Sequence, residues 1–157
     1  MACLTAVARD PLLRGITPFV LQVPIGELVG PQEIGIHLGE KYPGRFQATT
    51  RHSTAQNLAS SWTQAGYLQG KVRKLRTRPR ITPVVLTYAV TLGHLCGLRG
   101  KMLLQSLLVQ LLDRKPAELS DLASEASSQG WINYKTAGGV VEITLPEIPA
   151  KKAEGLE

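Results

Sequence analysis

The segment TTRHSTAQNLASSWTQAG, residues 49–66, carries its apolar side chains at the spacing of a single helix face. They stand at i, i+3, i+4, i+7 and i+10, in one narrow stripe: Ala55, Leu58, Ala59, Trp62 and Ala65. The glycine that follows suits the stop at a helix C-terminus. The pattern predicts an amphipathic helix over residues 50–65, and it places Trp62 in a core rather than on a surface where it would stack on bases.

The opposite face of this predicted helix carries only uncharged hydrogen-bonding side chains. An ordinary solvent-facing helix more often carries Lys and Glu at several of these positions. Short polar side chains on an element that fits the major groove are also the groups that read base edges in DNA. The candidate base-reading residues are Thr50, Ser53, Gln56, Asn57 and Ser60. A solvated surface or a contact with another protein is the alternative interpretation of the same face.

Positive charge is concentrated in the middle of the chain. The run KVRKLRTRPR, residues 71–80, holds six Lys and Arg. Between Lys41 and Leu112 there are eleven Lys and Arg and no Asp or Glu, although the net charge of the whole chain is +6. Such a segment favours a polyanionic partner, with a solvated linker or an RNA-facing loop as the alternative. The candidate phosphate-binding residues are Arg45, Arg51, Lys71, Arg73, Lys74, Arg76, Arg78 and Arg80.

The other elements of the first half are shorter. Residues 2–14 favour a helix, and ITPFVLQVPIG, residues 16–26, is β-branched and aromatic but holds two prolines, which predicts an extended segment or edge strand. PQEIGIHLGEKYP, residues 31–43, predicts a short helix that begins at a proline. After residue 66, the segments around Tyr67–Leu68 and Val72 predict two short strands with a glycine-containing turn between them.

The order of helix, turn, polar-faced helix and basic hairpin resembles the winged helix-turn-helix family of DNA-binding domains. The resemblance covers about residues 28–82 and depends on the element order and on TTRHSTAQNLASSWTQAGYL. It implies double-stranded DNA as the partner, with helix 50–65 as the reading element and residues 67–80 as a basic wing. The connection PGRFQATT departs from the family pattern, because it is longer than the turn of about 3–4 residues in the simplest units.

The second half repeats this order in a weaker form. Residues 84–112 favour two leucine-rich helices split at residues 97–100, and residues 117–129 favour an amphipathic helix with acids on its exposed face. Apolar and polar side chains alternate at the start of residues 131–146, WINYKTAGGVVEITLP, and a Gly-Gly turn follows. This pattern predicts a hairpin. We therefore expect a mainly α fold with short β-hairpins, arranged as tandem winged-helix-like units. The expected boundaries are 1–82 for a DNA-binding unit, 83–147 for an assembly unit and 148–157 for a flexible tail.

Motifs for catalysis are missing from the sequence. It has no phosphate-binding loop that ends in Lys-Ser/Thr, no nucleophile elbow and no His-Glu-x-x-His pair. Cys3 and Cys96 make no disulfide framework, and with three scattered histidines they make no metal-ligand spacing. We therefore expect no enzymatic activity, no cofactor and no metal.

Apolar runs are too short for a membrane span of about 20 residues, and the N-terminal residues lack the order of a secretory signal. We expect a cytoplasmic protein without a membrane partner, nucleoid-associated when it is bound to DNA. Transcriptional regulation, mobile-element biology and prokaryotic defence are all compatible settings.

The sequence favours a non-catalytic DNA-binding protein. Its leucine-rich second half, residues 84–130, favours a homodimer or a protein partner, because a small chain has little interior in which to bury so many leucines. The alternative from a different class is an adaptor subunit whose tandem winged helices hold proteins, or RNA and protein, together in a larger complex. The salt dependence of binding to a random duplex separates the two.

Overall fold

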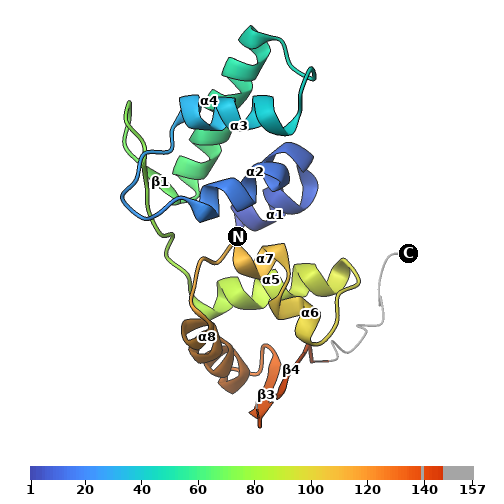
Figure 1. The fold of residues 1–157 in the computed structure, drawn as a ribbon. Coiled ribbons are helices and arrows are strands. Elements are labelled where there is room, and N and C mark those ends of the chain that lie inside the picture. Colours follow the sequence, from blue (N-terminus) through green and yellow to red (C-terminus); the bar gives the residue numbers. More distant parts are fainter. Residues whose placement is uncertain (139, 147–157) are drawn as a thin grey trace, which may run out of the picture.

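The computed structural model describes residues 1–138 and 140–146, so the predicted tail at 148–157 lies outside the described residues. The described chain is mainly α-helical with two short antiparallel hairpins, which confirms the prediction of a mainly α fold with short β-hairpins (Figure 1). Figure 1 shows the elements in an upper group, residues 2–76, and a lower group, residues 83–144, joined by one connecting segment. No helix in the described part of the chain is long and apolar enough to cross a membrane.

The chain begins with two helices, α1 (Ala2–Arg9) and α2 (Pro11–Gln22), where a single helix over 2–14 was expected. Asp10 separates them. Its carboxylate accepts hydrogen bonds from the N–H groups of Leu12 at 2.8 Å and Leu13 at 3.2 Å, and so caps the N-terminus of α2. The break between the helices therefore comes from a side-chain cap at Asp10, and α2 continues through Gly15.

The predicted extended segment over 16–26 is wrong, because α2 continues through Pro18 to Gln22. Pro18 is exposed and removes one backbone hydrogen bond from the helix. On the opposite face Leu13, Ile16 and Val20 are fully or almost fully buried. The burial of these three side chains outweighs the local preference of a β-branched, proline-containing segment.

Helices α3 (Pro31–Lys41) and α4 (Ala48–Gln64) form the predicted helix pair and pack closely against each other. Two glycines of α3 face α4. A Cβ on Gly35 would lie 3.6 Å from the Cβ of Ala55, which is ordinary van der Waals contact. A Cβ on Gly39 would lie 2.8 Å from the guanidinium of Arg51, so this side chain would have to move.

The apolar stripe of α4 is buried as predicted: Ala55, Leu58, Ala59 and Trp62. Trp62 has an exposed fraction of 0%, and its ring meets that of Tyr67 edge-on with the centroids 4.9 Å apart. The prediction that Trp62 belongs to the core is confirmed, and burial removes it from any surface that could stack on bases. Its indole Nε1 has no hydrogen-bond partner among the described residues.

A small sheet lies at the C-terminal end of α4. Strands β1 (Leu68–Gln69) and β2 (Leu75–Arg76) form the predicted hairpin, and residues 26–29 add along the other edge of β2. This third segment is held by hydrogen bonds from Gly26 N to Arg76 O (2.9 Å) and from Val29 N to Lys74 O (2.9 Å). The second strand lies at Leu75–Arg76 rather than at Val72, which sits in the turn and is 85% exposed.

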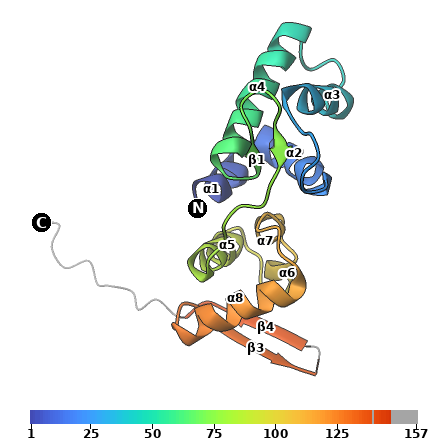
Figure 2. The ribbon, with the colours of Figure 1, turned by 90° about the vertical axis from the view of Figure 1, so that its left-hand side faces the viewer.

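The lower group consists of helices α5 (Pro83–Leu95), α6 (Lys101–Leu104), α7 (Leu107–Gln110) and α8 (Pro116–Ser128), followed by strands β3 (Asn133–Ala137) and β4 (Val140–Thr144). Helix α8 and the hairpin lie where the sequence predicted them, and Figure 2 shows the hairpin beside α8. The second leucine-rich helix is instead two short helices. Ser106 divides them, because its extended backbone and its hydroxyl, which accepts a hydrogen bond from Val109 N at 3.3 Å, begin a new helix.

Hydrogen bonds join the upper and lower groups. The hydroxyls of Thr5 on α1 and Tyr88 on α5 lie 2.7 Å apart. The hydroxyl of Tyr67 donates to the carbonyl of Leu111, and Arg114 donates to the carbonyl of Pro79 at 2.6 Å. The lower group is therefore attached both to α1 and to the segment that follows β2.

Candidate nucleic-acid interface

The polar face of α4 is open to solvent. All five predicted base-reading residues are exposed: Thr50, Ser53, Gln56, Asn57 and Ser60. The hydroxyl of Ser53 donates to the carbonyl of Thr49 at 3.1 Å, a local bond that leaves an oxygen lone pair facing outward. Helix α4 contains no acid, and its bases are Arg51 and His52. This face can therefore offer donors and acceptors to a partner without repelling an anion.

The basic hairpin lies alongside the C-terminal half of α4. The Nζ of Lys74 donates to the hydroxyl of Thr63 on α4 at 2.9 Å and to the carbonyl of Gly70 at 3.2 Å. Figure 2 shows the loop of the hairpin running along α4. The polar face of α4 and the charges of the hairpin are thus parts of one upper-group surface.

The tip of the hairpin presents Lys71 and Arg73 to solvent, and both side chains are exposed. Gly70 makes this tight turn possible. Its φ is +116°, and a Cβ at this position would lie 2.0 Å from the carbonyl oxygen of Arg73. The two charges at the tip are therefore held by a turn that requires glycine.

Arg76 does not reach the surface, so the prediction that it binds phosphate is wrong. Its side chain is 1% exposed and forms an ion pair with Asp113 at 2.8 Å. It also donates to the carbonyls of Val20 at 2.9 Å, Tyr67 at 3.4 Å and Thr77. Four of the five N–H donors of this guanidinium are engaged, and the side chain is buried, so it is not open to a phosphate.

The remaining bases beyond the hairpin lie on the segment that leads to the lower group. Arg80 is exposed. Arg78 is 43% exposed, and its Nε lies 3.7 Å from the carboxylate of Asp113, which reduces its net charge toward solvent. Arg80 is therefore the freer of the two, whereas Arg78 shares Asp113 with Arg76.

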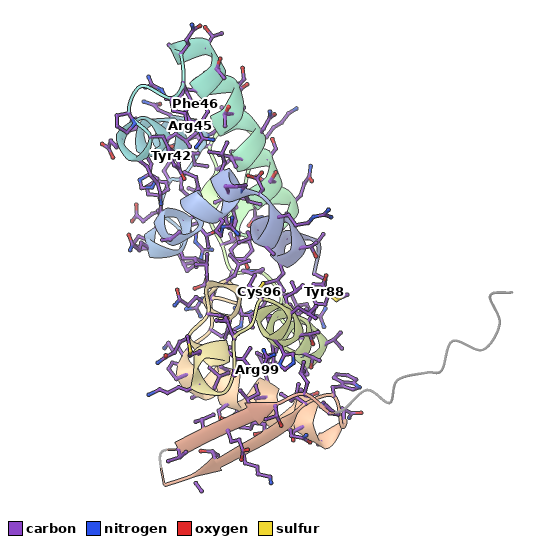
Figure 3. The ribbon with its side chains drawn as sticks, turned by 90° about the vertical axis from the view of Figure 1, so that its right-hand side faces the viewer. Tyr42, Arg45, Phe46, Tyr88, Cys96 and Arg99 are labelled. Atoms are coloured by element: carbon purple, nitrogen blue, oxygen red, sulfur yellow. The ribbon has the colours of Figure 1, made fainter. Side chains whose placement is uncertain are left out.

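At the other end of α4, Arg45 is held between two aromatic rings. Its guanidinium lies 5.2 Å from the centroid of Tyr42 and 5.4 Å from that of Phe46, and these two rings meet edge-on at 6.4 Å (Figure 3). Arg45 itself is exposed. The aromatic contacts favour one placement of the guanidinium beside the start of α4. Tyr42 and Phe46 were not among the predicted site residues, although the run YPGRF places both aromatics close to Arg45 in the sequence.

Arg51 and His52 lie at a groove between α3 and α4. The groove has a volume of about 840 Å³, and its walls include Gln32, Ile36 and Gln56. Arg51 is half-buried against Gly39, whereas His52 is exposed. Of the predicted residues, Arg51 and Gln56 therefore border this groove. Arg45 lies in the loop before α4, Arg76 is buried, and the others lie on the exposed face of α4 or on the basic segment.

The exposed face of α8 in the lower group differs in charge from that of α4. Asp121, Ser124 and Glu125 are exposed, as the sequence predicted. Ser120 is partly buried, and its hydroxyl lies 3.1 Å from that of Tyr134 on β3. Carboxylates on this face repel phosphate, so the two polar helix faces suit different partners.

Two buried titratable groups have raised pKa values, because burial disfavours their charged forms. The pKa of the Cys3 thiol rises to about 11, and the pKa of the Tyr67 phenol rises well above its usual range. Both shifts move the pKa farther above pH 7, whereas a general acid or base works best with a pKa near the working pH. The described residues contain no cluster of three or more His, Cys, Asp or Glu that could hold a metal ion.

Neither a family model, nor a curated protein, nor a solved structure matches this chain.

Proposed function

We propose that this chain is a non-catalytic DNA-binding protein of the winged-helix type. In this proposal α4 reads base edges in the major groove, and the basic hairpin and its flanks bind phosphates. One observation carries the proposal: the exposed, uncharged polar face of α4 lies beside exposed bases, and neither α4 nor the hairpin contains an acid. Bases of this kind supply affinity without sequence information, and short polar side chains supply base discrimination.

The order of elements in the upper group supports the same proposal. Helix α2 is followed by the sheet segment 26–29, by helices α3 and α4, and by the hairpin β1–β2. This is the order expected for a winged helix-turn-helix unit, in which the second helix of the pair is the reading element. Residues 68–76 would be the wing.

The experiment that tests phosphate binding measures the affinity for a random duplex as a function of salt concentration. Lys71, Arg73 and Arg80 are replaced together by Gln, since all three are exposed and carry no intramolecular ion pair among the described residues. Each lost phosphate contact should reduce the slope of log K against log salt by about 0.9, and all three together by about 2.7. The affinity should fall by a similar factor for every duplex sequence.

The matched control removes the same charge elsewhere. Arg9, Lys115 and Lys135 are exposed and lie outside the proposed interface, so their joint replacement by Gln changes the net charge equally. We expect the control to alter the slope far less than the hairpin variant. Equal slopes for the two variants would mean that the protein attracts DNA only through its net charge, and the proposed interface would be wrong.

Base reading has a separate test. A binding site is selected from random duplexes, and the preference for this site over a scrambled duplex is compared for wild type and Asn57→Ala at one salt concentration. An Asn paired bidentately with adenine contributes about 1–3 kcal/mol of discrimination, so the preference should fall by a factor of about 5 to 150. Asn133→Ala, an exposed Asn of the lower group, is the control. A preference that survives the loss of both Gln56 and Asn57 would place the recognition elsewhere.

A second candidate function is an adaptor subunit that holds proteins together. The lower group favours it, because Asp121 and Glu125 on α8 are exposed acids and Leu95 is 76% exposed. In that case wild type would bind a random duplex weakly and would select no site. The two measurements above therefore decide between the candidates.

A further inference from the structure

The outer face of α3 combines apolar and acidic side chains. Ile36, which is 56% exposed, stands between Glu33 and Glu40 at helical spacing. Ile36 and Glu40 border a hollow of about 290 Å³ that also includes Leu28, Glu33 and His37. We call this hollow the α3 groove; it adjoins the larger groove toward α4, whose wall carries Arg51 and His52. Glu33 and Glu40 form no ion pair with any base among the described residues, and the Glu33 carboxylate accepts a hydrogen bond from Gly30 N at 2.7 Å.

The turn between α5 and α6 has the complementary character. Leu95 is 76% exposed and Met102 is 60% exposed, and the exposed bases Arg99 and Lys101 stand between them in the chain. We call residues 95–102 the α5–α6 knob. Local hydrogen bonds close this turn: Arg99 donates to the carbonyl of His94 at 2.7 Å, and Leu98 N donates to Gly93 O at 3.0 Å. The turn therefore presents an apolar tip flanked by bases.

The knob and the groove lie apart within one chain, because α3 packs against α2 and α4 in the upper group, whereas α5 and α6 belong to the lower group. Figure 1 shows the turn between α5 and α6 at one edge of the lower group, with α3 in the upper group. Figure 3 places Cys96 and Arg99 in the lower group and Tyr42, just after the end of α3, in the upper group. Both surfaces are thus free to face another molecule.

We propose that the α5–α6 knob of one copy docks into the α3 groove of a second copy. Leu95 and Met102 would cover Ile36, and Arg99 and Lys101 would face Glu33 and Glu40. A second copy fits the groove because the same chain carries both an apolar projection flanked by bases and an apolar hollow flanked by acids, and the two surfaces complement each other. The proposal concerns the free protein and does not depend on DNA binding.

Such a contact is heterologous, because it joins two different surfaces. Each copy that docks leaves its own groove open and leaves its partner's knob open, so that further copies can add head to tail. The contact surface is small, and interfaces of this size are typically weak. Association should therefore appear as a continuous rise of mass with concentration rather than as one stable dimer.

The first experiment is sedimentation velocity from about 10 μM to about 1 mM, the range in which weak interfaces assemble. The variants are Ile36→Gln in the groove and Leu95→Gln in the knob, two exposed positions where glutamine fits a helix and adds no charge. Wild type should grow beyond the 17.0 kDa monomer, and each variant should associate at least about tenfold more weakly. A mixture of the two variants should form a dimer that does not extend, since only one intact knob and one intact groove remain.

The second experiment exchanges the charges. Glu40→Lys and Lys101→Glu should each weaken association, and the two changes in one chain should restore it, whereas Lys135→Glu serves as a control of equal charge change in an exposed strand. A wild type that stays monomeric throughout the range would overturn the proposal. Association that survives in both single Gln variants would also overturn it, because another surface would then be responsible. A mixture of those variants that forms no dimer would overturn it as well, because the contact would then be isologous or lie elsewhere.

Discussion

The ion pair between Arg76 and Asp113 links the two groups, and its removal should destabilise the whole chain. Asp113→Asn keeps the shape of the side chain and tolerates the φ of +51° that Asp113 adopts. The guanidinium of Arg76 then stays 1% exposed with carbonyl partners but without a counter-charge. Loss of one partner of a fully buried pair costs about 3–5 kcal/mol. Asp113 is 20% exposed, so solvent screening reduces the expected cost to about 2–3 kcal/mol.

The assay is thermal or urea unfolding of wild type and variant. For a chain of this size about 1 kcal/mol corresponds to about 2–4 °C, so the Tm should fall by about 4–12 °C. Arg76→Met and the double variant complete a cycle. The double variant should be only slightly less stable than Arg76→Met alone, because Asp113 then keeps only its contact at 3.7 Å with the partly exposed Arg78.

A free energy of unfolding within about 0.5 kcal/mol of wild type for Asp113→Asn would refute the reasoning, since that is the usual range of surface substitutions without a specific role. The cycle also has a functional readout. Arg76 is buried, so Arg76→Met should leave the salt slope of DNA binding unchanged per folded molecule, in contrast to the hairpin variant.

Three further substitutions test other parts of the fold. Trp62→Ala should cost about 3–5 kcal/mol, because it empties a fully buried site, and urea unfolding measures the loss. Gly70→Ala should cost about 1–3 kcal/mol by strain at φ +116° and by the clash with the Arg73 carbonyl; a Tm equal to wild type would show that the turn relaxes. Burial raises the pKa of Tyr67, so the stability that its protonated form contributes is complete below pH of about 10 and is lost as the pH rises toward the folded-state pKa. Tyr67→Phe should therefore lose less stability than wild type between pH of about 9 and 11, and parallel pH profiles would contradict this.

The spacing of apolar side chains predicted those elements in which the whole pattern lies within one helix or one hairpin. The stripe through Ala55, Leu58 and Trp62 identified α4 and its buried face, because all of its members lie on one helix. Helix α8 and the hairpin after it were predicted for the same reason. Helix α2 was missed, since its prolines and β-branched residues favour extended structure locally, and only burial of Ile16 and Val20 against other helices makes it helical.

The residues of the candidate site also divide into those whose exposure the local sequence predicted and one whose burial it did not predict. Exposure of Asn57 and Gln56 followed from their position opposite the stripe, which is a local property. The burial of Arg76 could not be predicted from its local sequence, because it depends on Asp113, which is distant in sequence and near in space. Asp113 is the first acid after the acid-free segment, and that position was the one available hint.

The packing of Trp62 against Tyr67 gives the molecule separate optical reporters. Trp62 is the tryptophan of the upper group and is shielded from water, whereas Trp131, the tryptophan of the lower group, is 40% exposed. Indole emission moves to longer wavelength when water surrounds the ring, so the two residues should emit at different wavelengths in the folded chain. Unfolding of the upper group should shift the emission strongly to the red, and unfolding of the lower group should shift it only slightly. Fluorescence recorded along a urea gradient can therefore reveal whether the two groups unfold together or in sequence, without any added label.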